Sequence, residues 1–291
     1  MTTETTPDAA ADAGKKSVAE RVAHEIRETA LTIAVFVPFW LLFSTFIYEL
    51  RSIPSESMVP ALQVGDRVAV AKFVYGYNRN SVPFGLGKLF IGEDEDNPMD
   101  GVWVRPPNRG DVAVFQHPNG GKVMIKRVIG LPGDTVQMRG GHLYLNGEEV
   151  PREEVRRTSY VAYDDPSGLL TTATEYRETL PGEDGSHLIH EWRDSAGLDR
   201  TPIFKVPEGH VFMMGDNRDN SEDSRACSGH PGLAELAPEA WNGCSLREDK
   251  AVGFVPMDHL IGRADTVLFT LNRCRKAEGA ECPAPRLWRG L

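Results

Sequence analysis

The sequence predicts a mainly β protein in which one N-terminal membrane-spanning helix precedes an antiparallel β body. One apolar run, residues 30–48, is long enough to cross a bilayer. The runs after it are short, rich in β-branched residues and often alternate with period two, and 28 Gly and 20 Pro supply many turns. A net charge of −10 without a dense basic cluster argues against nucleic-acid binding.

Residues 30–48 are predicted to form the membrane anchor. They contain no ionisable side chain except Tyr48, and a helix of this length spans about 29 Å, close to the hydrocarbon thickness of a bilayer. A cleaved signal peptide and a buried core helix are the alternatives. The run is longer than the apolar region of most signal peptides, and no A-x-A-like cleavage site follows it.

The distribution of positive charge predicts how the anchor is oriented. Four Lys or Arg residues lie within the fifteen residues before the run, whereas only Arg51 lies within the fifteen after it. Because positive flanks stay on the cytoplasmic side, residues 1–29 are expected to form a cytoplasmic tail. The rest of the chain is then expected on the outer face.

The body is predicted to consist of strands joined by turns, with two interruptions. Gly140–Gly141 and Asn146–Gly147 are typical hairpin turns. Residues 152–205 are more polar and divide the body into a first part, 49–151, and a second part, 206–291. Residues 226–251 form another excursion, expected to be a loop with a short helix. The runs expected to form strands are 66–76, 109–118, 122–134, 135–150, 210–216 and 264–271.

The four cysteines favour disulfides over a metal site. They are even in number and show no C-x-x-C spacing. Pairing of neighbours, Cys227 with Cys244 and Cys274 with Cys282, is the expected arrangement, with free thiols as the alternative.

Candidate chemistry centres on serine and lysine, because no histidine lies in a recognisable triad context. Lys126 lies in the run KVMIKRVIG, whose two faces are both largely apolar. Burial there would lower the pKa of the lysine and make it a base; the alternative is an edge lysine whose amine reaches water. His187 and His190 could bind a metal only with a third ligand, which is not evident.

The acidic segment GDNRDNSEDSR, residues 215–225, has the density of acidic and amide side chains that is typical of a calcium-binding loop. Counted from Asp219, position six is Ser224 instead of glycine and position twelve is His230 instead of glutamate. The sequence therefore does not predict an EF-hand loop, and a hydrogen-bonded polar turn of structural use is the alternative.

Five ordered segments resemble the conserved boxes of the bacterial type I signal peptidases. They are PSESMVPAL with GDRVAVAKF, RGDVAVF, KRVIGLPGD, GDNRDNSEDSR, and GFVP with LIGRA, between residues 53 and 263. The resemblance implies a membrane-bound serine endopeptidase with a Ser-Lys dyad. Its catalytic domain would be a coiled antiparallel β fold with an inserted β-rich cap, corresponding to residues 152–205. The 226–251 insertion departs from the family, in which SR and GFVP are usually closer.

The resemblance also implies individual roles. Ser57 would be the nucleophile and Lys126 the general base, and Ser55 with the backbone N–H of Ser57 would form the oxyanion hole. Ser221 would orient the lysine, and Asp223 and Arg225 would support the dyad. The residues implied to line the substrate pockets are Ile53, Met58, Leu62, Val114 and Ile125.

The implied substrates are secretory preproteins cut after Ala-x-Ala-like sites, with neither a metal nor a cofactor required. The implied location is the bacterial cytoplasmic membrane, with the catalytic domain on its outer face near the protein export machinery. Two alternative functions make different demands on the sequence. A self-cleaving Ser-Lys repressor would bring a DNA-binding module and no anchor, and an inactive membrane-anchored binding module would need none of the dyad residues.

Overall fold

The computed structural model describes residues 18–82, 101–118, 121–163, 167–193, 198–225, 252–271, 274 and 277–291. Contacts divide the chain into two compact units, which meet between Ser44 and Thr45. The first contains most of helix α1 (Val18–Phe46), which includes Pro38. In the described part of the chain, α1 is the one helix long and apolar enough to cross a membrane, over Glu20–Ser44. This finding is consistent with the predicted anchor.

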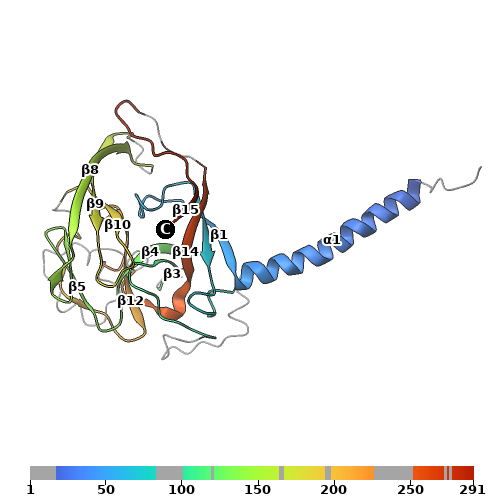
Figure 1. Ribbon diagram of the computed structural model, residues 1–291, viewed down its shortest axis with the longest axis horizontal. Helices are drawn as coiled ribbons and strands as arrows, with labels where there is room; N and C mark the ends of the chain where they lie inside the picture. Colours follow the sequence, from blue (N-terminus) through green and yellow to red (C-terminus); the bar gives the residue numbers. More distant parts are fainter. Residues whose placement is uncertain are drawn as a thin grey trace, which may run out of the picture. The chain divides into compact units, whose positions relative to one another are not determined.

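The second unit is a body built on a curled antiparallel sheet, as the sequence predicts (Figure 1). The strand order is β1-β2-β14-β3-β4-β12-β13, and β15 pairs with β14 beyond the end of β3. Strands from the beginning and the end of the body therefore lie side by side, because β2 pairs with β14. The strands are β1 (Tyr48–Ser52), β2 (Asp66–Ala71), β3 (Val112–Gln116), β4 (Val123–Gly130), β12 (His210–Met214), β13 (Val255–Pro256), β14 (Leu260–Thr270) and β15 (Leu287–Gly290), with a short 3-10 helix, η3 (Met257–His259), before β14.

A four-stranded sheet has the order β11-β5-β6-β7. Its hairpins confirm both predicted turns: Gly140 and Gly141 have φ values of 58° and 83°, and Asn146 and Gly147 have φ values of 54° and 86°. Such left-handed conformations are what two-residue hairpins require, and they explain the glycines. The strands are β5 (Thr135–Arg139), β6 (His142–Leu145), β7 (Glu148–Glu149) and β11 (Phe204–Lys205).

A three-stranded sheet, ordered β10-β9-β8, occupies the segment expected to be a cap. Its strands are β8 (Arg152–Val161), β9 (Leu170–Glu178) and β10 (His187–Glu191). An isolated bridge from His190 to Asn217 links it to the loop after β12. The domain boundaries at 152 and 205 stay predictions.

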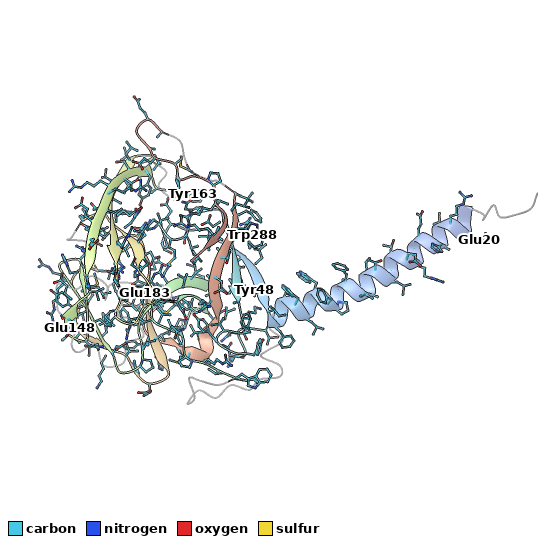
Figure 2. The ribbon with its side chains drawn as sticks, viewed as in Figure 1. Glu20, Tyr48, Glu148, Tyr163, Glu183 and Trp288 are labelled. Carbon is cyan, nitrogen blue, oxygen red and sulfur yellow. A yellow bond between two sulfur atoms is a disulfide. The ribbon has the colours of Figure 1, made fainter. Side chains whose placement is uncertain are left out.

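One predicted disulfide is confirmed, since Cys274 and Cys282 are bonded. Cys227, Cys244 and the 226–251 excursion lie outside the described residues. Figure 2 shows side chains on the strands of all three sheets of the body. One apolar cluster brings Ile53, Met58 and Leu62 against β2 and β14, and it holds the segment after β1 onto the sheet.

Candidate active site

The segment that carries Ser55 and Ser57 is fixed by backbone hydrogen bonds on two sides. The amide of Ile53 donates to Asp66 O (3.0 Å), and the amide of Gly65 donates to Ile53 O (2.9 Å). On the other side, the amide of Asn217 donates to Ser57 O (3.1 Å) and its side-chain Nδ2 donates to Glu56 O (3.2 Å). The Ser57 backbone is therefore positioned by β2 and by the loop after β12.

Lys126 reaches Ser57 from the centre of the sheet. Its Nζ donates to Ser57 Oγ over 2.6 Å. The residue is only 3% exposed, because β4 is flanked by β3 and, from Arg127 onward, by β12. Burial lowers the pKa of Lys126 to about 8, although Asp223, Asp216 and Glu222 act in the opposite direction. A neutral amine beside a serine hydroxyl can accept its proton.

Ser55 lies on the same segment as the nucleophile, with its Oγ 3.4 Å from Ser57 Oγ. This distance shows that both hydroxyls face the same space, although residues 55–57 form a bend and a turn. A carbonyl attacked by Ser57 can thus come within reach of the Ser55 hydroxyl.

At Gly215, the loop after β12 packs closely against Ser221 and against the backbone of Ser57. A Cβ atom at this position would lie 2.2 Å from Ser221 Oγ and 2.5 Å from Ser57 O. The absence of a side chain is what lets Ser221 and the nucleophile segment pack on this backbone. The amide of Gly215 also donates to Asp223 Oδ2 (3.0 Å).

Asp223 and Arg225 form a fully buried ion pair behind the dyad. Arg225 Nε donates to Asp223 Oδ1 and Nη2 to Oδ2, each over 2.9 Å, and Nη2 also donates to Arg218 O (2.6 Å). Burial by itself would raise the pKa of Asp223, but the Arg225 guanidinium and the hydrogen bond from the Gly215 amide outweigh it and hold the pKa below its usual range. The pair keeps the 215–225 loop in one conformation.

The sheet edge beside the dyad is open to an extended chain. β4 pairs with β3 along Val123–Arg127, whereas the described ladder with β12 begins only at Arg127. The second edge of Val123–Lys126 therefore has no strand partner among the described residues. The implied pocket residues gather here: Ile125 packs against the cluster of Ile53, Met58 and Leu62 and also against the cluster of Val114.

Comparison with known proteins places this arrangement in a family. Residues 26–269 match the family described as Signal peptidase, peptidase S26. The chain belongs to the signal peptidase S26 family. It is 35% identical to Signal peptidase I of Pseudomonas aeruginosa over 78% of this chain and 66% of that protein. It is 32% identical to Signal peptidase I of Rickettsia typhi over 79% of this chain and 75% of that one.

A solved signal peptidase I from Enterococcus faecalis V583 has 25% identity, a TM-score of 0.27, and covers 55% of this chain and 97% of its own. Membership of the signal peptidase S26 family confirms the resemblance that the sequence boxes indicated, and with it the class of serine endopeptidase. The chain spans about two thirds of the Pseudomonas relative.

The structure brings together the predicted dyad, Ser55 and the support residues, whose roles stay predictions. Ser221 Oγ has no hydrogen-bond partner among the described residues, so the structure shows no hydrogen bond between Ser221 and Lys126. Asn217, Gly215 and the Arg127–Asp216 pair were not given roles from sequence. Arg127 Nε and Nη2 donate to the two carboxylate oxygens of Asp216 over 2.8 and 2.7 Å, beside Lys126. All three features lie in the GDNRDNSEDSR and KRVIGLPGD boxes. Attention to opposite charges in those two boxes could have found the Arg127–Asp216 pair.

Burial and ion pairs define the surroundings of three other side chains. Met58, one of the implied pocket residues, is fully buried in the apolar cluster. His187 and His190 face different carboxylates, Glu178 and Glu183 for His187 and Glu175 for His190. Within the described residues they share no cluster of metal-ligand spacing.

Proposed function

We propose that the chain is a membrane-bound endopeptidase that removes N-terminal signal peptides from exported preproteins by a Ser-Lys dyad. The observation that carries the proposal is the 2.6 Å hydrogen bond from buried Lys126 to Ser57. Family membership supports the reaction class, and the lowered pKa of Lys126 supports its use as a base near neutral pH.

In the first step, Ser57 Oγ attacks the scissile carbonyl carbon while its proton passes to Lys126 Nζ. The carbonyl oxygen becomes an oxyanion and accepts hydrogen bonds from the Ser55 hydroxyl and the Ser57 N–H. Collapse of this intermediate breaks the C–N bond, and the Lys126 ammonium gives its proton to the departing amine. The products are a free mature chain and a signal peptide esterified to Ser57.

In the second step, Lys126 removes a proton from water, whose oxygen attacks the ester carbonyl. The second oxyanion is stabilised by the same donors. Its collapse returns the proton from Lys126 to Ser57 Oγ and releases the signal peptide as a carboxylate. Ser221, Asp223 and Arg225 hold the lysine and its loop in place without exchanging protons.

The substrate would bind as an added β-strand along the open edge of Val123–Lys126, opposite the segment of Ile53–Ser55. Alternate side chains would then point into pockets whose floors are formed by the buried residues around Ile125. Because these floors are already close-packed, only small side chains fit at −1 and −3. This accounts for cleavage after Ala-x-Ala-like sites.

Helix α1 would anchor the enzyme in the cytoplasmic membrane, with its N-terminus inside and the body on the outer face. A signal peptide's apolar segment lies in the same bilayer, so its cleavage site emerges near that surface, where the body is tethered. Preproteins are delivered there by the export machinery, which places that machinery close to the enzyme.

The test is cleavage of a purified preprotein by the full chain in liposomes, with the new N-terminus of the product sequenced. The expected result is one cut after an Ala-x-Ala site, which is lost when −1 or −3 is replaced by a bulky residue. Replacement of the intervening residue, whose side chain points away from the pockets, is the matched control and should leave cleavage unchanged. Binding without any cut by the folded protein would instead support the binding-module alternative.

A further inference from the structure

Three carboxylates converge behind the catalytic loop, outside the site described above. They come from the end of β10 (Glu191), the following segment (Asp199) and the loop after β12 (Asp219). One oxygen of each lies within 4.8 Å of the others. Oxygens bound to one Ca²⁺ lie up to about 5 Å apart, since each bond is about 2.3–2.6 Å long. The spacing therefore fits ligands of a single ion.

The cluster contains carboxylate oxygens that the described structure leaves unsatisfied. Glu191 is 2% exposed, and its Oε1 has no hydrogen-bond partner among the described residues. Asp219 accepts hydrogen bonds at Oδ2 from the amides of Trp192 (2.6 Å) and Arg193 (3.0 Å), whereas its Oδ1 is buried and has none in the same part of the chain. A buried carboxylate oxygen without a partner is costly, and a cation would satisfy both.

Two guanidinium groups lie near the cluster, but neither satisfies Glu191 Oε1. Arg218 is matched by Glu178, with Nη1 donating over 2.9 Å. Arg152 is the other guanidinium nearby, and its Nη1 lies 3.5 Å from Glu191 Oε2. Arg152 contacts Oε2, so Oε1 of Glu191 stays without a donor among the described residues.

We propose that Glu191, Asp199 and Asp219 bind a Ca²⁺ ion that ties the cap strand β10 to the catalytic loop. Asp219 lies two residues before Ser221 and two after Asn217, whose amide holds Ser57. An ion at this point would fix the loop that supports the dyad, with water completing its oxygen ligands. This site differs from the EF-hand pattern excluded by sequence, because its ligands come from separate segments.

The test uses the full chain in detergent after removal of metals by a chelator, and its readouts do not depend on peptidase activity. Ca²⁺ is added while thermal unfolding is followed, and Mg²⁺ is added in a parallel series. Tb³⁺, which replaces Ca²⁺ and emits when excited through a nearby indole, reports occupancy directly, because Trp192 adjoins the cluster. Ca²⁺ is expected to raise the Tm by several degrees and to displace Tb³⁺, with a weaker effect from Mg²⁺.

Glu191→Gln and Asp219→Asn keep the shape of each side chain and remove its charge. Each variant is expected to weaken Tb³⁺ binding by about 10-fold or more and to lose most of the Ca²⁺-dependent rise in Tm. Glu148→Gln is the matched control, because Glu148 is exposed on β7 at the outer edge of the body (Figure 2), and it should behave as wild type.

Either of two results would overturn the proposal. One is the absence of both a Ca²⁺-dependent Tm shift and Tb³⁺ emission in the folded wild type. The other is a response in Glu191→Gln and Asp219→Asn equal to that of wild type, which would place the ion elsewhere. Circular dichroism of both variants shows whether a lost response reflects the site or a loss of fold.

Discussion

Lys126 and Ser57 are 69 residues apart in sequence, yet the lysine Nζ donates to the serine Oγ over 2.6 Å inside the body. The contact depends on three neighbours in the sheet and its loops. β4 carries the lysine, β2 holds the segment before the serine, and Asn217 holds the serine carbonyl. Displacement of any one of them would lengthen the bond between base and nucleophile.

The lowered pKa of Lys126 predicts the acid limb of the pH profile. The lysine acts as a base only when neutral, so kcat/KM should rise with pH through a midpoint at about 8. Glu222→Gln removes a carboxylate that raises this pKa, and it should move the limb to lower pH. An acid limb near 10.4, the value of an exposed lysine, or a shift of Glu222→Gln to higher pH would contradict the assignment.

Ser55→Ala tests the second oxyanion donor. Loss of one such donor typically lowers kcat by about 10²–10³-fold, and substrate binding should change little because the hydroxyl acts mainly on the transition state. The neighbouring Ser52, exposed on β1, supplies the control, since Ser52→Ala should retain wild-type kcat. Equal kcat values for the two variants would exclude Ser55 from the reaction.

Gly215→Ala tests the close packing behind the nucleophile. The added methyl would lie 2.2 Å from Ser221 Oγ and 2.5 Å from Ser57 O, so both must move. Misplacement of about 1 Å can cost about 100-fold in rate, and a loss of at least this size in kcat is expected. Gly290→Ala is a matched control for folding, because Gly290, like Gly215, has no left-handed φ, and no atom lies within 4 Å of its added Cβ. Full activity of folded Gly215→Ala would refute this packing role.

Arg286 is predicted to stabilise the segment that follows the nucleophile. Its Nη2 donates to Pro60 O (2.6 Å) and its Nη1 to Ala61 O (2.5 Å), and Nη1 lies 3.3 Å from Asp66 Oδ2. Arg286→Ala removes the side-chain donor of the half-buried Pro60 and Ala61 carbonyls and the positive charge beside buried Asp66, which should lower the free energy of unfolding by about 1–3 kcal/mol. Thermal unfolding measures the Tm of Arg286→Ala and of Arg289→Ala. Arg289 is an exposed neighbour, and its substitution is expected to leave the Tm unchanged. Similar Tm values for both would contradict it.

Much of the fold follows from local sequence signals. Period-two runs located β2 to β6, β12 and β14, and left-handed turn residues located the β5–β6 and β6–β7 hairpins. The apolar run 30–48 predicted a helix, and its residues 30–46 lie in α1, which begins earlier, at Val18. Strand order could not be predicted, since the pairing of β2 with β14 joins segments almost 200 residues apart and depends on global packing.

The site was predictable where side chains perform chemistry and not where backbone contacts position it. Ser57 and Lys126 followed from the resemblance, and apolar neighbours independently suggested a buried lysine. Asn217 was missed because its function is to bind the carbonyl of Ser57, and Gly215 was missed because its function is to leave room. Neither role leaves a mark on periodicity or composition. The carboxylates Glu191, Asp199 and Asp219 come together only through folding.

Cleavage of one purified preprotein by wild type, Ser57→Ala and Lys126→Ala, side by side in liposomes, tests the dyad most directly. Lys205→Ala is the control for the lysine, because Lys205 is exposed on β11. The account predicts cleavage by wild type and Lys205→Ala, and loss of activity in both dyad variants while circular dichroism shows them folded. Cleavage by Ser57→Ala or by Lys126→Ala at the wild-type rate would contradict it.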